Sequence, residues 1–163
     1  MRFIRLICLV ALCSISFAQA VRADFETASE AYNKGDYATA LEEWQALADK
    51  GNAPAQYALG LMYKKGLGVR QDYNEAVPWF WKAAEQGYSS AQSALGVMYT
   101  EGLGLLLDYV EAHKWFAIAA AQGNEGAKKN LASIAERMTP EQVGEAEKLA
   151  AEWKPCGKTT PCR

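Results

Sequence analysis

Histidine is almost absent from this sequence of 163 residues, and its scarcity removes several classes of catalytic site. His113 stands alone, so a zinc site of the His-Glu-x-x-His type, which needs two histidines, is excluded. A Ser-His-Asp triad would depend on His113, and no nucleophile-elbow motif accompanies it. The phosphate-binding motif Gly-x-x-x-x-Gly-Lys-Ser/Thr is also missing. We therefore expect His113 to be a solvent-exposed helical side chain, and we predict neither enzyme activity nor a cofactor.

Positive charge is also scarce, because the chain carries 17 basic residues against 19 acidic ones. Arg2 and Arg5 lie in an N-terminal segment that we expect to be removed, which leaves 15 basic residues and a net charge near −4. A protein that binds nucleic acid needs a basic face. The composition therefore disfavours DNA or RNA as a partner.

Apolar runs long enough to span a membrane are lacking, so we expect no transmembrane segment. Residues 6–18 are uncharged and mostly apolar, and Ala18-Gln19-Ala20 follows them with the small-x-small pattern that signal peptidase cleaves. This pattern predicts a signal peptide of residues 1–20, with cleavage after residue 23 as the alternative. We therefore expect a periplasmic or secreted protein of a bacterial envelope.

Cysteines number only four, and Cys8 and Cys13 would leave with the signal peptide. Cys156 and Cys162 remain in a C-terminal tail, residues 154–163, and such a pair in a secreted chain is typical of a disulfide. Two thiols with no second pair or histidine nearby make a poor zinc site, and their spacing is not the redox Cys-x-x-Cys. We predict a structural disulfide at the C-terminus and no bound metal.

What the sequence does contain is a period of 36 residues. The residues that recur 36 positions later are Ala55, Leu59, Gly60, Tyr63, Gly66, Gly68, Asp72, Tyr73, Ala76, Trp79, Ala83, Ala84 and Gly87. The phase predicts a helical repeat domain over residues 24–153. Its parts are a truncated repeat (24–54), two full repeats (55–90 and 91–126) and closing helices (127–153).

Each repeat is predicted to form two antiparallel helices. Ala55, Leu59 and Tyr63 recur at spacings that place them on one helical face. Gly66 then ends the first helix, and Asp72 begins the second as an N-cap, with a glutamate three residues on to complete a capping box. Thr139 and Pro140 begin a last helix in the same way.

Glycine also recurs inside the first helices, at Gly60 and Gly96. An interior glycine costs about 1 kcal/mol relative to alanine, so its recurrence indicates close helix packing. We expect Trp79 and Trp115 to fill the wider end of the space between the helices. These aromatic and small residues are interpreted as packing and not as a cofactor site.

Two runs carry a resemblance to a known family: AQYALGLMYKKGLGVRQDYNEAVPWFWKAAEQGYSSA and AQSALGVMYTEGLGLLLDYVEAHKWFAIAAAQGNEGA. They resemble consecutive Sel-one-like repeats, which are relatives of tetratricopeptide repeats. The resemblance implies an all-α fold, a right-handed α-solenoid of antiparallel helix pairs, and a scaffold that binds a protein or peptide, in envelope signalling or host interaction. One branch of the family has a cysteine pair in every repeat and is linked to β-lactam binding or hydrolysis. This chain lacks those cysteines, so a cell-wall or β-lactam hydrolase is the disfavoured alternative.

The concave side of such a stack is lined by the first helices of the repeats and usually receives the partner. Projection of the free positions gives three columns, which are Tyr57, Ser93 and Lys129; Leu61, Val97 and Ser133; and Lys64, Thr100 and Glu136. Their mixture of aromatic, apolar and basic groups suits a peptide or a short protein segment.

An apolar loop forms the last candidate site. GLGLLLDY occupies the place of GLGVRQDY one period earlier, so Leu106 and Leu107 replace Arg70 and Gln71. Two interpretations stay open, since the leucines either pack under the C-terminal helix or form a patch for a partner or for self-association.

Overall fold

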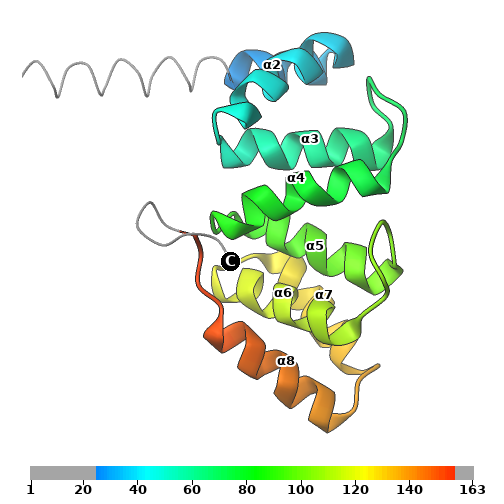
Figure 1. Cartoon of the computed structure of the whole chain (residues 1–163), viewed down its shortest axis with the longest axis vertical. Coiled ribbons are helices and arrows are strands. Elements are labelled where there is room, and N and C mark those ends of the chain that lie inside the picture. The colour runs from blue at the N-terminus through cyan, green and yellow to red at the C-terminus, as the bar shows by residue number, and fades with distance from the viewer. Residues whose placement is uncertain (1–24, 157–163) are drawn as a thin grey trace, which may run out of the picture.

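The computed structural model describes residues 25–156, and within this range every regular element is a helix. A helical segment at residues 25–33 comes first. The helices that follow are α2 (Tyr37–Asp49), α3 (Ala53–Lys65), α4 (Tyr73–Glu85), α5 (Ser89–Glu101), α6 (Tyr109–Ala121), α7 (Glu125–Ala135) and α8 (Pro140–Glu152). Figure 1 shows them stacked along the long axis of the molecule. The predicted all-α helical solenoid is confirmed.

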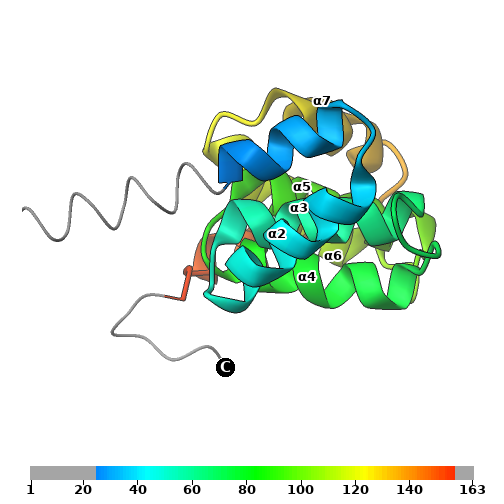
Figure 2. The same cartoon turned by 90° about the horizontal axis from the view of Figure 1, so that it is seen from above.

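The helices form two layers, which Figure 2 shows from above. Residues 25–33, α3, α5 and α7 lie in one layer, called the A layer here, and α2, α4 and α6 lie in the other, the B layer. Helix α3 packs against α4 and α5 packs against α6, while α2 on α3, α4 on α5 and α6 on α7 join the successive pairs. The first helices of the repeats therefore share one face.

Short polar signals begin and end these helices. Gly66 and Gly102 end α3 and α5 in the left-handed conformation, with φ of 70° and 66°. Asp72 caps α4 and Asp108 caps α6, each by accepting from two backbone amides, but the predicted glutamate half of the capping box is absent at both helices. The Glu111 carboxylate instead accepts a hydrogen bond from Lys114 Nζ at 2.6 Å. A complete capping box forms at the start of α8.

The interior glycines lie against aromatic rings of the second helices. A Cβ placed on Gly96 would stand 2.5 Å from Cε1 of Phe116, and one on Gly60 would stand 2.5 Å from Cδ1 of Phe80. Both phenylalanines are buried and occupy one slot of the 36-residue period. The predicted close packing at the two glycines is therefore confirmed, and a phenylalanine ring is what approaches them.

The two tryptophans of the period do not behave alike. Trp115 is buried in the core, as expected. Trp79 is only half-buried, and the Nζ atom of Lys82 lies 3.8 Å from the centroid of its ring. Trp79 therefore packs only at the edge of the core, as a partly buried residue, and Phe80 beside it is the fully buried aromatic of α4.

Buried amide groups join successive repeats. The fully buried Gln92 donates from Nε2 to the carbonyl of Ala84 at 3.2 Å, and its Oε1 accepts from Gln122 Nε2 at 2.7 Å. Gln56 makes the same two kinds of bond one repeat earlier. A buried amide that is fully hydrogen-bonded fixes the relative position of its neighbours. These bonds therefore set how each A helix sits on the preceding B helix.

The closing helices do not form a further antiparallel pair. Helix α7 packs on α6, whereas α8 also packs on α6 and not chiefly on α7. Trp153 follows α8 and meets Trp115 edge-on, with ring centroids 5.9 Å apart. The chain then turns back, and the Cys156 amide donates to the Glu85 carbonyl at 2.6 Å. The C-terminal segment thus runs back to the end of α4.

Some sequence predictions concern residues beyond the described range. The predicted signal peptide, residues 1–20, and Cys162 both lie outside residues 25–156. The cleavage site and the pairing of Cys156 with Cys162 therefore stay predictions.

Candidate functional site

Some residues of the three predicted columns line pockets on the A layer, and these pockets are two separate ones. Tyr57 and Leu61 line a pocket at the N-terminal end of the stack. Val97, Thr100 and Ser133 line another between α5 and α7. The other predicted residues, which line neither of these two pockets, are Lys64, Ser93, Lys129 and Glu136.

The N-terminal pocket has a volume of about 200 Å³ and walls that are almost wholly apolar. Its lining residues are Phe25, Tyr32, Trp44, Pro54, Tyr57, Ala58, Leu61 and Tyr88. Tyr32 and Phe25 pack against the Trp44 ring, with centroids 5.3 and 6.0 Å away. Across these lie Tyr57 and Tyr88, whose centroids are 5.4 Å apart. The pocket thus offers aromatic walls to an apolar group.

Sequence reasoning identified only Tyr57 and Leu61 of this pocket and missed its N-terminal wall. Phe25, Tyr32 and Trp44 belong to the truncated first repeat, where the 36-residue phase is weak, so no column reached them. Tyr57 is also less free than predicted, because it packs on the buried Phe80 ring at 5.9 Å. Burial raises the pKa of the Tyr57 phenol, which agrees with its apolar surroundings.

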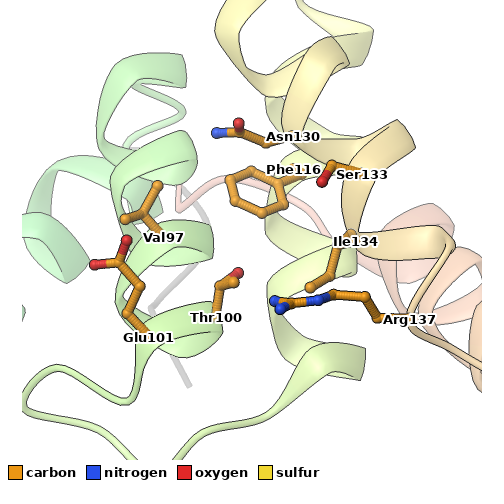
Figure 3. Close-up of a pocket in the computed structure, with 8 residues that line it drawn as sticks. All are labelled: Val97, Thr100, Glu101, Phe116, Asn130, Ser133, Ile134 and Arg137. Carbon is orange, nitrogen blue, oxygen red and sulfur yellow. The ribbon is translucent and has the colours of Figure 1, made fainter.

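The second pocket combines an apolar floor with a polar rim, and Figure 3 shows its residues. Its volume is about 120 Å³. The floor is formed by Val97, Phe116 and Ile134, while Asn130 and Ser133 reach in from α7. The pocket therefore suits a small apolar side chain with polar groups beside it.

Two opposite charges stand on the rim of this pocket. Glu101 comes from the end of α5, and Arg137 follows α7. The Arg137 guanidinium lies 5.6 Å from the centroid of the Tyr109 ring, and within the described residues it forms no ion pair with Glu101. The Thr100 hydroxyl donates to the Gly96 carbonyl at 2.8 Å, so it is already engaged. Both charged groups are thus open to an outside partner.

His113 differs from the expectation, because it is buried, with 4% of its surface exposed. Its Nδ1 atom has no hydrogen-bond partner among the described residues. Burial lowers the pKa of His113, and Glu147 on α8 opposes that shift. The prediction of a solvent-exposed side chain is wrong because α8 packs on α6, which the repeat pattern did not indicate.

The structure decides between the two interpretations of the apolar loop, because both of its leucines are exposed. Leu106 is 89% exposed and Leu107 is 57% exposed, so burial under the C-terminal helix is wrong. The loop is held elsewhere, at Gly104, whose φ is +67° and where a Cβ would stand 2.6 Å from the Tyr73 carbonyl oxygen. The loop backbone thus lies against Tyr73 at Gly104, while both leucines remain exposed.

Other kinds of site find little support in the part of the chain that the structure describes. No group of three or more His, Cys, Asp or Glu side chains there is placed to hold a metal ion. None of its helices has the length and apolar character needed to cross a bilayer.

Comparison with known proteins identifies the repeat. The family model described as Sel1 repeat matches residues 53–88 and 89–124, which begin at the first residues of α3 and α5. This is a Sel1 repeat protein. Each matched repeat begins two residues before the repeat that we assigned from the sequence, at residue 53 in place of 55 and at residue 89 in place of 91. The period of 36 residues is the same. The search of curated proteins gave no match.

Solved structures of Sel1 repeats resemble the chain closely. One is c5321, described as a protective antigen present in uropathogenic Escherichia coli strains and displaying an SLR fold. It has a TM-score of 0.77 and 34% identity, over 80% of this chain and 29% of c5321. A Sel1 repeat protein from Oxalobacter formigenes has a TM-score of 0.67 and 32% identity, over 78% of this chain and 55% of that protein. The chain thus spans less than a third of the first protein and about half of the second.

Sel1 repeats are scaffolds that typically mediate protein interaction. The first helix of each matched repeat contributes to one of the two pockets, α3 to the N-terminal pocket and α5 to the second one.

Proposed function

We propose that this Sel1 repeat protein is a periplasmic or secreted adaptor that binds a segment of another protein on its A layer. The observation that carries the proposal is the aromatic pocket at Tyr57 and Leu61. Tyrosine and tryptophan walls that surround an apolar space are typical of the positions that contribute most to a protein interface. The second pocket, at Val97 and Ser133, lies on the same layer and offers a second place where a partner side chain can bind.

The proposed location rests on the sequence alone. Residues 6–18 and the Ala18-Gln19-Ala20 site support export, and the low basic content supports a protein partner over a nucleic acid. Envelope signalling and host interaction are both compatible with such an adaptor. N-terminal sequencing of the exported chain distinguishes cleavage after Ala20 from cleavage after Ala23, and a chain that begins at Met1 in the envelope would contradict the export signal.

A hydrolase is the weaker candidate. A Ser-His-Asp mechanism needs a carboxylate that accepts a hydrogen bond from Nδ1 of the imidazole, but His113 Nδ1 is buried without a hydrogen-bond partner in the described structure. Binding therefore accounts for the described residues better than turnover does.

Site-specific photocrosslinking in the native envelope tests the adaptor function. A photoreactive amino acid is placed at Leu61 in the aromatic pocket, and in a matched chain at Lys82, which is exposed on α4 in the B layer. Tyr57 is avoided because its packing on Phe80 would confuse lost binding with lost stability. We expect adducts with a defined protein segment from the Leu61 position and none from Lys82.

Quantitative binding completes the test. The segment found in the adducts is purified, and Leu61→Asp is expected to weaken its binding about tenfold, because a carboxylate would then need desolvation in an apolar pocket. Identical adducts from both positions, or unchanged affinity of the variant, would remove the A layer as the partner surface.

A further inference from the structure

One position of the 36-residue period is occupied by residues of alternating charge. Lys65, Glu101 and Arg137 are separated by 36 residues each, and all three are exposed. They lie at the ends of α3 and α5 and just beyond α7. None of them takes part in an ion pair within residues 25–156. The slot therefore presents positive, negative and positive charge in order along the A layer.

The pocket between α5 and α7 lies between the last two of these charges. Val97 and Phe116 form its floor, and Glu101 and Arg137 stand on opposite walls, as Figure 3 shows. The Tyr109 ring supports the Arg137 guanidinium from one side. A ligand that fills this pocket would therefore meet an anion on the α5 side and a cation on the α7 side.

We propose that this pocket holds an aliphatic side chain of an extended partner segment whose basic residue faces Glu101 and whose acidic residue faces Arg137. In an extended chain, residues two apart point to the same side and are separated by roughly 7 Å. The partner pattern is therefore basic-x-aliphatic-x-acidic, running from α5 toward α7. This inference rests on the proposed function, since it names the chemistry of the segment that the A layer binds.

Lys65 occupies the same position of the period as Glu101, one repeat earlier, and extends the charge pattern toward α3. A longer segment would place a further acidic residue over Lys65, on the α3 side of its basic residue. Exposed ion pairs of this kind contribute little affinity singly, and they act mainly by fixing orientation and excluding partners of the wrong charge order. The direction of the bound segment is thus the property that the three charges determine.

Two synthetic peptides test the charge pattern. One is acetyl-Gly-Lys-Ser-Leu-Ser-Glu-Gly-amide, and the other has lysine in place of its glutamate, so that neither chain direction gives it an acidic residue for Arg137. Each is titrated into the ¹⁵N-labelled mature chain, and binding is followed by the amide signals of Val97 and Ser133. We expect the first peptide to bind about fivefold more tightly than the second.

A protein with one rim charge reversed provides the decisive comparison. In Arg137→Glu the preference should reverse, and because this side chain is exposed the fold should be retained. The matched control is Lys128→Glu, which also replaces a basic residue by an acidic one, at an exposed position of α7 that does not line the pocket. The control should keep the original preference.

Three results would overturn the inference: equal binding of the two peptides, a preference that survives Arg137→Glu, or no shift at Val97 and Ser133. If the Leu61 adducts are found while the peptides give one of these results, the adaptor function stands and the charge pattern falls. If the Leu61 adducts are also missing, both proposals fall.

Discussion

The substitution Gly96→Ala sets two physical effects against each other. In the interior of a helix, alanine is favoured over glycine by about 1 kcal/mol, so propensity alone predicts a more stable protein. The structure predicts the opposite, because the new Cβ would stand 2.5, 2.6 and 2.8 Å from three atoms of the Phe116 ring. Phe116 is 2% exposed, so its ring cannot move into solvent.

The magnitude follows from overpacking in a filled core. Added methyl groups in such cores cost about 1–3 kcal/mol, and three contacts under 3.0 Å place Gly96→Ala toward the upper end. Subtraction of the propensity gain leaves a net loss of about 1–2 kcal/mol in the free energy of unfolding. Gly144→Ala is the matched control, since Gly144 lies inside α8 with no atom within 4 Å of its Cβ position. It should stabilise the protein by about 0.5–1 kcal/mol.

The assay is urea denaturation of the mature chain, followed by helical circular dichroism for wild type and both variants. The two alanine variants should differ by roughly 1.5–3 kcal/mol, which is large compared with the uncertainty of extrapolation. Gly60→Ala should resemble Gly96→Ala, because Phe80 lies against it in the same way. If Gly96→Ala stabilised the chain as much as Gly144→Ala does, the packing of α5 on the Phe116 ring would be refuted.

Two further predictions concern the residues whose placement differs from expectation. Burial lowers the pKa of His113, so the unfolded chain binds the proton more readily, and stability should be full above the unfolded pKa of about 6.5 and decline as pH falls below it. Urea midpoints at pH 8 and pH 5 should therefore differ less for His113→Gln than for wild type, and an equal difference would contradict the assignment. Leu106→Arg/Leu107→Gln, which restores the residues of the preceding loop, should change stability by less than about 0.5 kcal/mol because both leucines are exposed. Sedimentation velocity then decides self-association, since a variant that sediments like wild type at every concentration would remove the leucine patch as a contact between copies.

The fold could be predicted from the sequence because the residues that pack the helices together recur every 36 positions. Gly66, Asp72 and the alanines of the second helices are constrained by geometry in each repeat, so the period reports their structure directly. Gln56 and Gln92 recur in the same way, yet their role was missed, because a glutamine in a helix is more often exposed than buried. Their partners are a preceding carbonyl and a later amide, and that combination becomes visible only in three dimensions.

The partner surface was harder to predict from the sequence, for a related reason. A position that faces a partner is free to vary between repeats, so the period says which slots point outward but not which of them line a pocket. The aromatic pocket depends on Phe25 and Tyr32, which come from a helix out of phase with the later repeats. His113 was misplaced because α8 follows no repeat rule, and its packing on α6 had no signal in the period.

The position of α8 also explains why the A layer stays available at its C-terminal end. A further repeat would continue the stack beyond α7, but α8 packs on α6 in the B layer instead. The outward residues of α7 are accordingly polar, as Glu125 and Lys128 are, and they pair with each other in solvent. Terminal repeats of solenoids need such a polar outer face to stay soluble. Within residues 25–156 no further helix covers Ser133 or Arg137, so the pocket keeps its apolar floor and a guanidinium that forms no ion pair with these residues.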